Sequence, residues 1–89
     1  MPLNRCPACE NTLTFAPWRA DVPSFKPCPF CGIQFGDNDA REDLRELIYQ
    51  EWRAAWIANE REPFEGDEWQ RVSALVTSNA QKKRATGGT

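Results

Sequence analysis

The 89-residue chain contains no histidine. An imidazole therefore cannot act as a metal ligand, a general base or a pH sensor in this protein. Strongly apolar side chains are also scarce, because leucine, isoleucine, valine and phenylalanine together make up 16 of the 89 residues. At this share an ordinary hydrophobic core becomes doubtful. The four tryptophans offset part of the deficit, since each can bury a large ring. The remaining folding energy must have another source.

Long apolar runs and a strong net charge are missing as well. No stretch approaches the roughly 20 apolar residues that cross a bilayer, and residues 1–11 contain no apolar signal segment. We therefore expect a cytoplasmic protein that does not associate with membranes. The net charge is only −2. This excludes a nucleic-acid interface that covers the whole chain.

The charge is unevenly distributed along the chain. Residues 1–36 carry three basic and two acidic side chains, residues 37–68 carry four basic and eleven acidic ones, and residues 69–89 carry four basic ones and no acidic one. The segments therefore have net charges of +1, −7 and +4. A basic tail, defined here as Lys82, Lys83 and Arg84, is the one part of the chain whose charge favours contact with nucleic acid.

All four cysteines belong to two Cys-Pro-x-Cys pairs, and eighteen residues separate the pairs. Two thiolates two residues apart can bind a metal ion from one tight turn, and a second such turn completes a tetrahedron. In a cytosolic chain this spacing favours a metal site over two disulfides. A redox-active pair is less favoured, because no βαβ pattern surrounds either pair. We predict that one metal ion is bound by Cys6, Cys9, Cys28 and Cys31.

Zinc is the expected metal and iron is the alternative, because tetrahedral four-sulfur sites accept either ion. The segment from Cys28 to Gly32 looks like a rubredoxin knuckle, although rubredoxin pairs usually lie farther apart in sequence. A structural zinc ion contributes on the order of 10 kcal/mol to folding. We therefore expect the metal-free chain to be largely unfolded or molten.

The residues that follow the two pairs differ in their backbone preferences. Gly32 readily adopts the positive φ that such turns often need. Glu10 does not favour positive φ, whereas Asn11 tolerates it better. The first turn is therefore expected to be looser, or to bend one residue later.

Residues 1–36 are predicted to form a small antiparallel zinc ribbon. The alternation of polar and apolar side chains predicts a strand over residues 12–15 and another over residues 33–35, with a returning strand at Phe25 and Lys26. Residues 16–24 contain two prolines and are expected to form a loop. The apolar side chains available for the ribbon's face are Leu13, Phe15, Phe25, Ile33 and Phe35.

Residues 37–84 are predicted to form two helices that pack on the ribbon, within one domain. Asp39 followed by Glu42 resembles a capping box at the start of the first helix, and Pro63 requires this helix to end by Glu62. Its apolar residues recur at helical spacing: Leu44, Leu47, Ile48, Trp52, Ala55 and Trp56.

A second helix is expected to open at Asp67, and residues 85–89 are expected to form a flexible tail. The apolar face of this helix is predicted to consist of Trp69, Val72, Leu75 and Val76. The predicted fold class is therefore a small α+β protein, a zinc ribbon followed by two α-helices.

The motifs resemble those of small cysteine-rich bacterial proteins named for their Cys-Pro-Cys-Cys motif. The resemblance covers about residues 6–64, and rests on the two cysteine pairs, the stretch around Phe35-Gly36-Asp37 and the tryptophan-containing segment 49–57. The chain departs from the pattern at Glu10, where glycine is usual, and at Phe30, where the motif has a third cysteine. The resemblance implies a zinc-ribbon-like fold and no established activity.

Four cysteines would close a metal site, so no enzyme is expected: a catalytic zinc keeps an open position. An electron carrier would follow if iron were bound. Nucleic-acid binding is the main alternative, through the basic tail.

We favour a protein-binding module, because tryptophan and arginine commonly anchor interfaces. Trp18 and Arg19, in the predicted loop, are the candidate contact residues, although Trp18 packed over the ribbon is an equal alternative.

Overall fold

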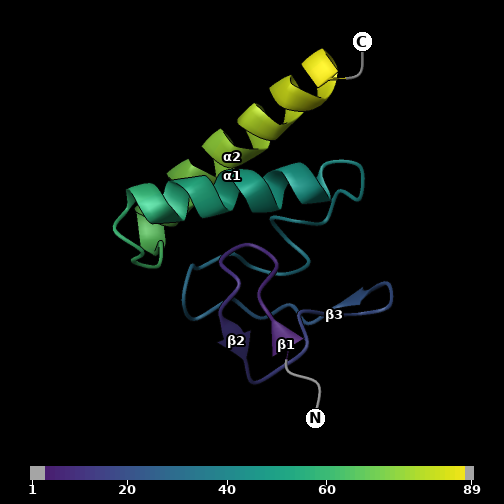
Figure 1. The fold of residues 1–89 in the computed structure, drawn as a ribbon, viewed down its shortest axis with the longest axis vertical. Coiled ribbons are helices and arrows are strands. Elements are labelled where there is room, and N and C mark those ends of the chain that lie inside the picture. Colours follow the sequence, from purple (N-terminus) through teal and green to yellow (C-terminus); the bar gives the residue numbers. More distant parts are fainter. Residues whose placement is uncertain (1–3, 88–89) are drawn as a thin grey trace.

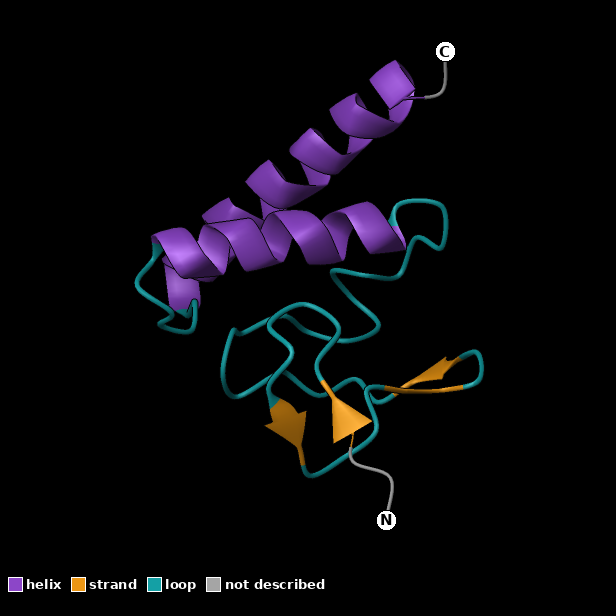
Figure 2. Ribbon diagram, in the orientation of Figure 1, coloured by secondary structure: helices purple, strands orange, loops and turns teal. Residues whose placement is uncertain are grey.

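A computed structural model describes residues 4–87 of the chain. It contains two antiparallel hairpins followed by two helices (Figures 1 and 2). The first hairpin pairs β1 (Asn4–Arg5) with β2 (Thr12–Leu13), and the second pairs β3 (Trp18–Arg19) with β4 (Val22–Pro23). The helices are α1 (Arg45–Ala58) and α2 (Gly66–Gly87). The small α+β class is therefore confirmed.

The two helices cross on one side of the molecule, and the hairpins lie at the opposite end (Figure 1). The loop between β1 and β2 turns toward α1, whereas the β3–β4 hairpin extends sideways from the body of the protein. The loops that carry the cysteines thus lie between strands and helices. Neither helix, as far as the chain is described, is both long and apolar enough to span a lipid bilayer.

The strands differ from those expected. Thr12 and Leu13 do form a strand, but its partner is β1 and not a returning strand at residues 25–26. Phe25 has a φ of 58° and is 64% exposed, so it neither extends a strand nor contributes to the core. Residues 33–35 provide only a single bridge, between Gln34 and Pro27. Strands of two residues carry too little alternation to be located from sequence.

The first helix starts later than the expected capping box. α1 begins at Arg45 after a series of turns, with Leu44 at the N-cap position and no side-chain cap. The Asp39 side chain is fully buried instead. Its carboxylate accepts hydrogen bonds from the backbone N–H of Gly36 at 2.6 Å, from Trp18 Nε1 at 2.8 Å and from the Tyr49 hydroxyl at 2.6 Å. The expected capping residue therefore joins the loop, the hairpin and α1.

The ends of the helices otherwise follow the sequence closely. α1 ends at Ala58, before Pro63 as expected. α2 begins at Gly66, one residue before the expected start, and continues to Gly87, beyond the expected end at residue 84. The predicted flexibility of residues 85–89 stays a prediction, and residues 88–89 lie outside the described part.

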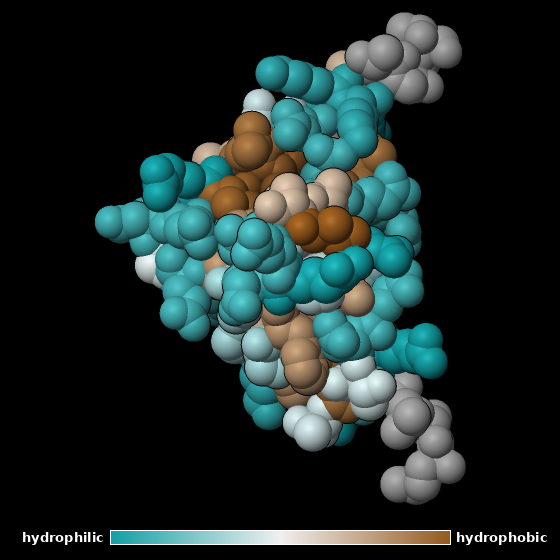
Figure 3. All heavy atoms as spheres, turned by 60° about the vertical axis from the view of Figure 1, so that its left-hand side comes forward, coloured by the Kyte–Doolittle hydropathy of each residue, from teal (hydrophilic) through white to brown (hydrophobic). Residues whose placement is uncertain are grey.

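The core joins the cysteine loops to both helices. Trp52 is its centre, with no exposed surface, and packs edge-on against Phe64 and Trp69 with centroid distances of 5.8 and 6.5 Å. Leu75, expected on the apolar face of α2, is 56% exposed instead, because Val76 and Ala80 face the core. On the face shown in Figure 3 polar residues predominate, and apolar residues reach the surface in one patch in the upper half and a smaller one below it.

Candidate metal centre

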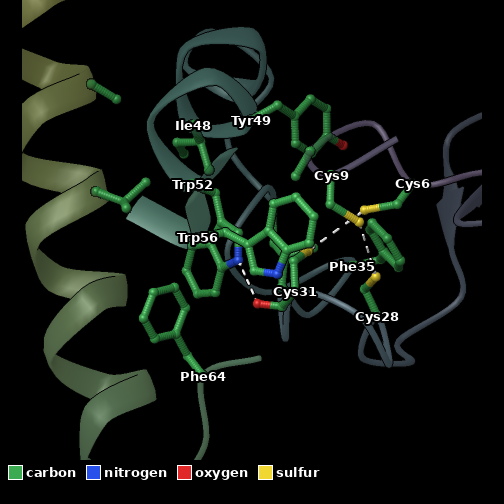
Figure 4. Packing of buried hydrophobic residues seen from close by; sticks show 14 of the residues in the cluster. Cys6, Cys9, Cys28, Cys31, Phe35, Ile48, Tyr49, Trp52, Trp56 and Phe64 are labelled. Carbon is green, nitrogen blue, oxygen red and sulfur yellow. Dashed lines mark hydrogen bonds between the residues drawn. The ribbon is translucent and has the colours of Figure 1, made fainter. Parts of the chain in front are cut away.

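The four cysteine sulfurs form one buried cluster. Their Sγ atoms all lie within 4.8 Å of one another, and the Cys6–Cys31 and Cys9–Cys28 pairs are each 3.7 Å apart. These separations are far longer than a disulfide bond. The two 3.7 Å separations match the roughly 3.8 Å edge of a tetrahedron whose sulfurs lie about 2.3 Å from a central zinc. Figure 4 shows the four side chains pointing toward one another. The cluster could hold one metal ion.

Two loops with the same backbone pattern position these sulfurs. We call residues 6–11 the first knuckle and residues 28–33 the second. The carbonyl of Cys6 accepts a hydrogen bond from the N–H of Glu10 at 2.8 Å, and that of Cys28 accepts one from Gly32 at 2.9 Å. The N–H of each of these cysteines donates in turn to the carbonyl five residues later, at 3.0 Å to Asn11 and 2.8 Å to Ile33. Each knuckle is therefore a closed turn whose shape is set by its own backbone.

Both knuckles bend at the fifth residue, contrary to the expectation for the first. Glu10 adopts a φ of 68° and Gly32 a φ of 83°. The Glu10 side chain is exposed, and its carboxylate contacts Arg53 of α1 at 2.7 Å. The backbone hydrogen bonds of the knuckle hold Glu10 in a conformation that costs an L-residue about 1 kcal/mol.

One side-chain donor reaches the cluster directly. The Asn11 amide donates a hydrogen bond to Cys9 Sγ at 3.3 Å. Such a contact favours the thiolate, which is the form that binds metal. From the sequence, Asn11 is expected only to tolerate a positive φ. Its position two residues after Cys9 was the signal that could have indicated a sulfur contact.

The thiols influence one another strongly. The hydrogen bond with Cys28 is the main cause of the lowered pKa of Cys9, and the hydrogen bond with Cys31 lowers the pKa of Cys28 to about 7. Neighbouring sulfurs, Cys28 first, raise the pKa of Cys31. Four thiolates this close cannot all ionise without a compensating positive charge. A bound cation would supply that charge and keep all four deprotonated.

Three tryptophans from the helices bind the backbone of the second knuckle. Trp56, Trp52 and Trp69 donate their indole N–H groups to three consecutive carbonyls, those of Phe30, Cys31 and Gly32, at 2.8, 2.9 and 2.7 Å. We call this arrangement the indole clamp; Figure 4 shows its central bond, from Trp52 to Cys31. The sequence placed these tryptophans on apolar helix faces, but it could not indicate which carbonyls they contact. The clamp ties the second knuckle to both helices.

The second knuckle also packs tightly against the chain between the helices. A Cβ atom placed on Gly32 would lie 2.6 Å from the carbonyl oxygen and 3.0 Å from the amide nitrogen of Phe64. Gly32 is therefore needed for close approach as well as for its backbone angle. No such contact constrains the exposed Glu10.

The candidate contact residues Trp18 and Arg19 lie on β3. Trp18 is half-buried, donates its indole N–H to Asp39 and has the Arg45 guanidinium 4.1 Å from the centroid of its ring. Arg19 is exposed and forms no ion pair with any described residue. The structure thus engages Trp18 internally and leaves the Arg19 guanidinium accessible.

Two residues of the basic tail contact acidic side chains of α1 and of the turn before it. Lys83 forms an ion pair with Glu51, and Arg84 lies 3.6 Å from the carboxylate of Asp43. These contacts bring the positive end of the chain against its acidic middle segment. Two of the three cations proposed for nucleic-acid contact therefore have acidic neighbours.

One hollow in the described part of the chain lies away from the sulfurs. It has a volume of about 540 Å³ and is bordered by α2 and the loop before α1. Its charged lining residues are Asp37 and Arg41, and Arg41 forms an ion pair with Asp43.

No protein-family model matches this sequence, and neither the curated proteins nor the solved structures yield a match. The likeness to the Cys-Pro-Cys-Cys proteins therefore stays an expectation from the motifs.

Proposed function

We propose that this chain is a non-enzymatic protein-binding module of zinc-ribbon type, stabilised by one zinc ion. Four buried sulfurs within 4.8 Å of one another support a closed site, in which no position remains for water or substrate. The metal in this proposal has a structural role. Reduced cysteines are needed to bind it, which agrees with a reducing compartment such as the cytoplasm.

The exposed ring of Phe25 is the observation that carries the binding role. Phe25 is 64% exposed and adopts a φ of 58°, a conformation that is strained for a bulky residue. Neither property helps folding, and strained backbone is often retained at functional sites. One edge of the ring lies close to Gly36, since a Cβ atom placed there would be 2.9 Å from Phe25 Cδ1. Val22, 64% exposed at the end of the neighbouring hairpin, adds a second apolar contact.

The other functions have less support from the observed contacts. A nucleic-acid-binding zinc ribbon would use the basic tail, but Lys83 and Arg84 lie against Glu51 and Asp43. An electron carrier requires iron, which the same four thiolates would accept. If the purified protein is red and contains one iron per chain, the assigned metal becomes iron and the electron-carrier function is favoured.

Two measurements test the proposal. Metal analysis of the purified protein should find one zinc per chain. Affinity capture from the native host should then be compared between the wild type and Phe25→Asn, because asparagine tolerates positive φ and preserves the turn. Leu75→Gln is the matched control, since Leu75 is a second exposed apolar side chain, on α2.

We expect Phe25→Asn to keep its zinc and its stability and to weaken capture of a specific partner about tenfold, as a hot-spot residue does. Leu75→Gln should bind like the wild type. Equal capture by all three proteins would contradict the binding role of Phe25.

A further inference from the structure

A groove beside the second hairpin combines apolar walls with positive charge. It has a volume of about 320 Å³, and its lining includes Phe15, Val22 and Pro23 together with Arg19 and Lys26. We call it the Arg19–Lys26 groove. A volume of this order accommodates a few side chains of a bound peptide.

The positive charge in this groove is uncompensated. Neither Arg19 nor Lys26 forms an ion pair with a described residue, and none of the described residues that line the groove is acidic. Several cations elsewhere are paired, such as Arg53 with Glu10 and Lys83 with Glu51. The nearest acid in sequence, Asp21, lies in the turn of the hairpin and does not line the groove.

Backbone contacts order the main chain from which both cationic side chains extend. Arg19 pairs with Val22 across the β3–β4 hairpin. The N–H of Lys26 donates to the Ser24 hydroxyl at 3.3 Å, and the carbonyl of Lys26 accepts from the N–H of Phe35 at 3.3 Å. Charges attached to an ordered backbone lose less entropy when they bind a partner.

We propose that the Arg19–Lys26 groove binds an acidic peptide segment of a partner protein, with carboxylates at Arg19 and Lys26 and an aliphatic side chain against Phe15 and Val22. This inference rests on the proposed protein-binding function and names the chemistry of the partner.

A nucleic acid fits this groove less well than an acidic peptide. The Lys26 ammonium lies 5.2 Å from the centroid of the Phe15 ring. The Phe35 ring packs against the same Phe15 ring, with 6.2 Å between the two centroids. The ring is therefore a poor stacking surface for a base.

The test is selection of peptides on the zinc-loaded full-length protein from a phage-displayed library of random dodecapeptides. The selected peptides should be enriched in aspartate and glutamate together with leucine or phenylalanine. Their affinity should fall about tenfold or more in Arg19→Glu combined with Lys26→Glu, and should weaken with salt. Arg5→Glu is the matched control, because Arg5 is a second exposed arginine without an ion pair, on β1 and outside the groove.

Three results would overturn the inference: no acidic enrichment, an equal loss in Arg5→Glu, or tighter Arg19-dependent binding of a poly(dT) oligonucleotide than of any selected peptide. Failure here is distinguishable from failure of the proposed function. Suppose that Phe25→Asn loses the captured partner and that the Arg19→Glu, Lys26→Glu double variant retains it. This result would support the proposed protein-binding function and contradict the binding of an acidic peptide in the Arg19–Lys26 groove.

Discussion

Glu10 and Gly32 occupy equivalent positions in the two knuckles, with φ angles of 68° and 83° and the same hydrogen bond back to the first cysteine of each pair. Their environments differ. Glu10 faces solvent and Arg53, whereas Gly32 lies against the backbone of Phe64. The repeated turn therefore tolerates a side chain in one copy and excludes it in the other.

Substitution by alanine should destabilise the protein much more at Gly32 than at Glu10. Gly32→Ala should lower the free energy of unfolding by about 3 kcal/mol, because a methyl group would meet backbone atoms of Phe64 and alanine disfavours positive φ. Glu10→Ala should lower it by less than about 1 kcal/mol, since it removes only an exposed ion pair. Urea denaturation of the zinc-loaded proteins measures both values. Similar losses in the two variants would contradict the account of the asymmetry.

The indole clamp should contribute measurably to stability. Trp52→Phe keeps an aromatic ring but leaves the buried Cys31 carbonyl without its indole donor. We expect a loss of about 3 kcal/mol from the unsatisfied carbonyl and the smaller ring. Trp18→Phe is the control and should cost less, because Asp39 Oδ2 still accepts a hydrogen bond from Tyr49. Thermal unfolding at saturating zinc compares the two, and an equal loss would contradict a special role for the clamp.

The Asn11 amide should strengthen metal binding. Asn11→Ala should reduce zinc affinity about tenfold, because Cys9 loses the donor that stabilises its thiolate. Competition with a chromophoric chelator measures this affinity. Asn59→Ala serves as the control, since the Asn59 amide donates to the Glu62 carbonyl near the end of α1 and touches no cysteine. An unchanged affinity in Asn11→Ala would show that the amide–sulfur contact does not influence the metal.

Tyr49 should make the protein less stable at alkaline pH. Burial, followed by the hydrogen bond to Asp39, raises the pKa of Tyr49. Above about pH 10 a tyrosine in the unfolded chain loses its proton, while the folded state keeps it. The unfolded state then binds fewer protons, so stability falls as pH rises.

Tyr49 is the single tyrosine of the chain, so tyrosinate absorbance reports on it alone. The folded protein should show no tyrosinate signal near pH 10, and the signal should appear together with unfolding. Comparison with Tyr49→Phe separates this effect from the titration of the thiols. Free ionisation of Tyr49 in the folded state near pH 10 would contradict its burial against Asp39.

Removal of the metal should unfold much of the molecule. The sulfur cluster lies within the core, and the Trp52 indole beside it has no exposed surface. A strong chelator should therefore abolish the near-ultraviolet circular dichroism and shift tryptophan emission to longer wavelength. Added zinc should restore both signals. A chelated chain that retains cooperative unfolding and native emission would show that the apolar core is sufficient.

Local rules located some elements well and others poorly. The helical spacing from Leu44 to Trp56 identified α1, and all four cysteines predicted to bind metal lie in one cluster. The start of α1 was missed because Asp39, a good capping residue in isolation, is buried against Trp18 and Tyr49. Phe25 was assigned to the ribbon's apolar face because its pattern resembles a strand, but its backbone turns at positive φ.

Short-range patterns in the sequence specify the four cysteines of the sulfur cluster and the two helices. Both are encoded over short distances, by two-residue spacing between thiols and by helical periodicity. Tertiary packing is needed before three indoles can donate to consecutive carbonyls of the second knuckle and before Phe64 can confine Gly32. Packing also leaves the Arg19 and Lys26 charges without an acidic neighbour in their groove. Each of these contacts joins segments distant in sequence, and hydrogen-bond geometry and close approach exist only once those segments pack together.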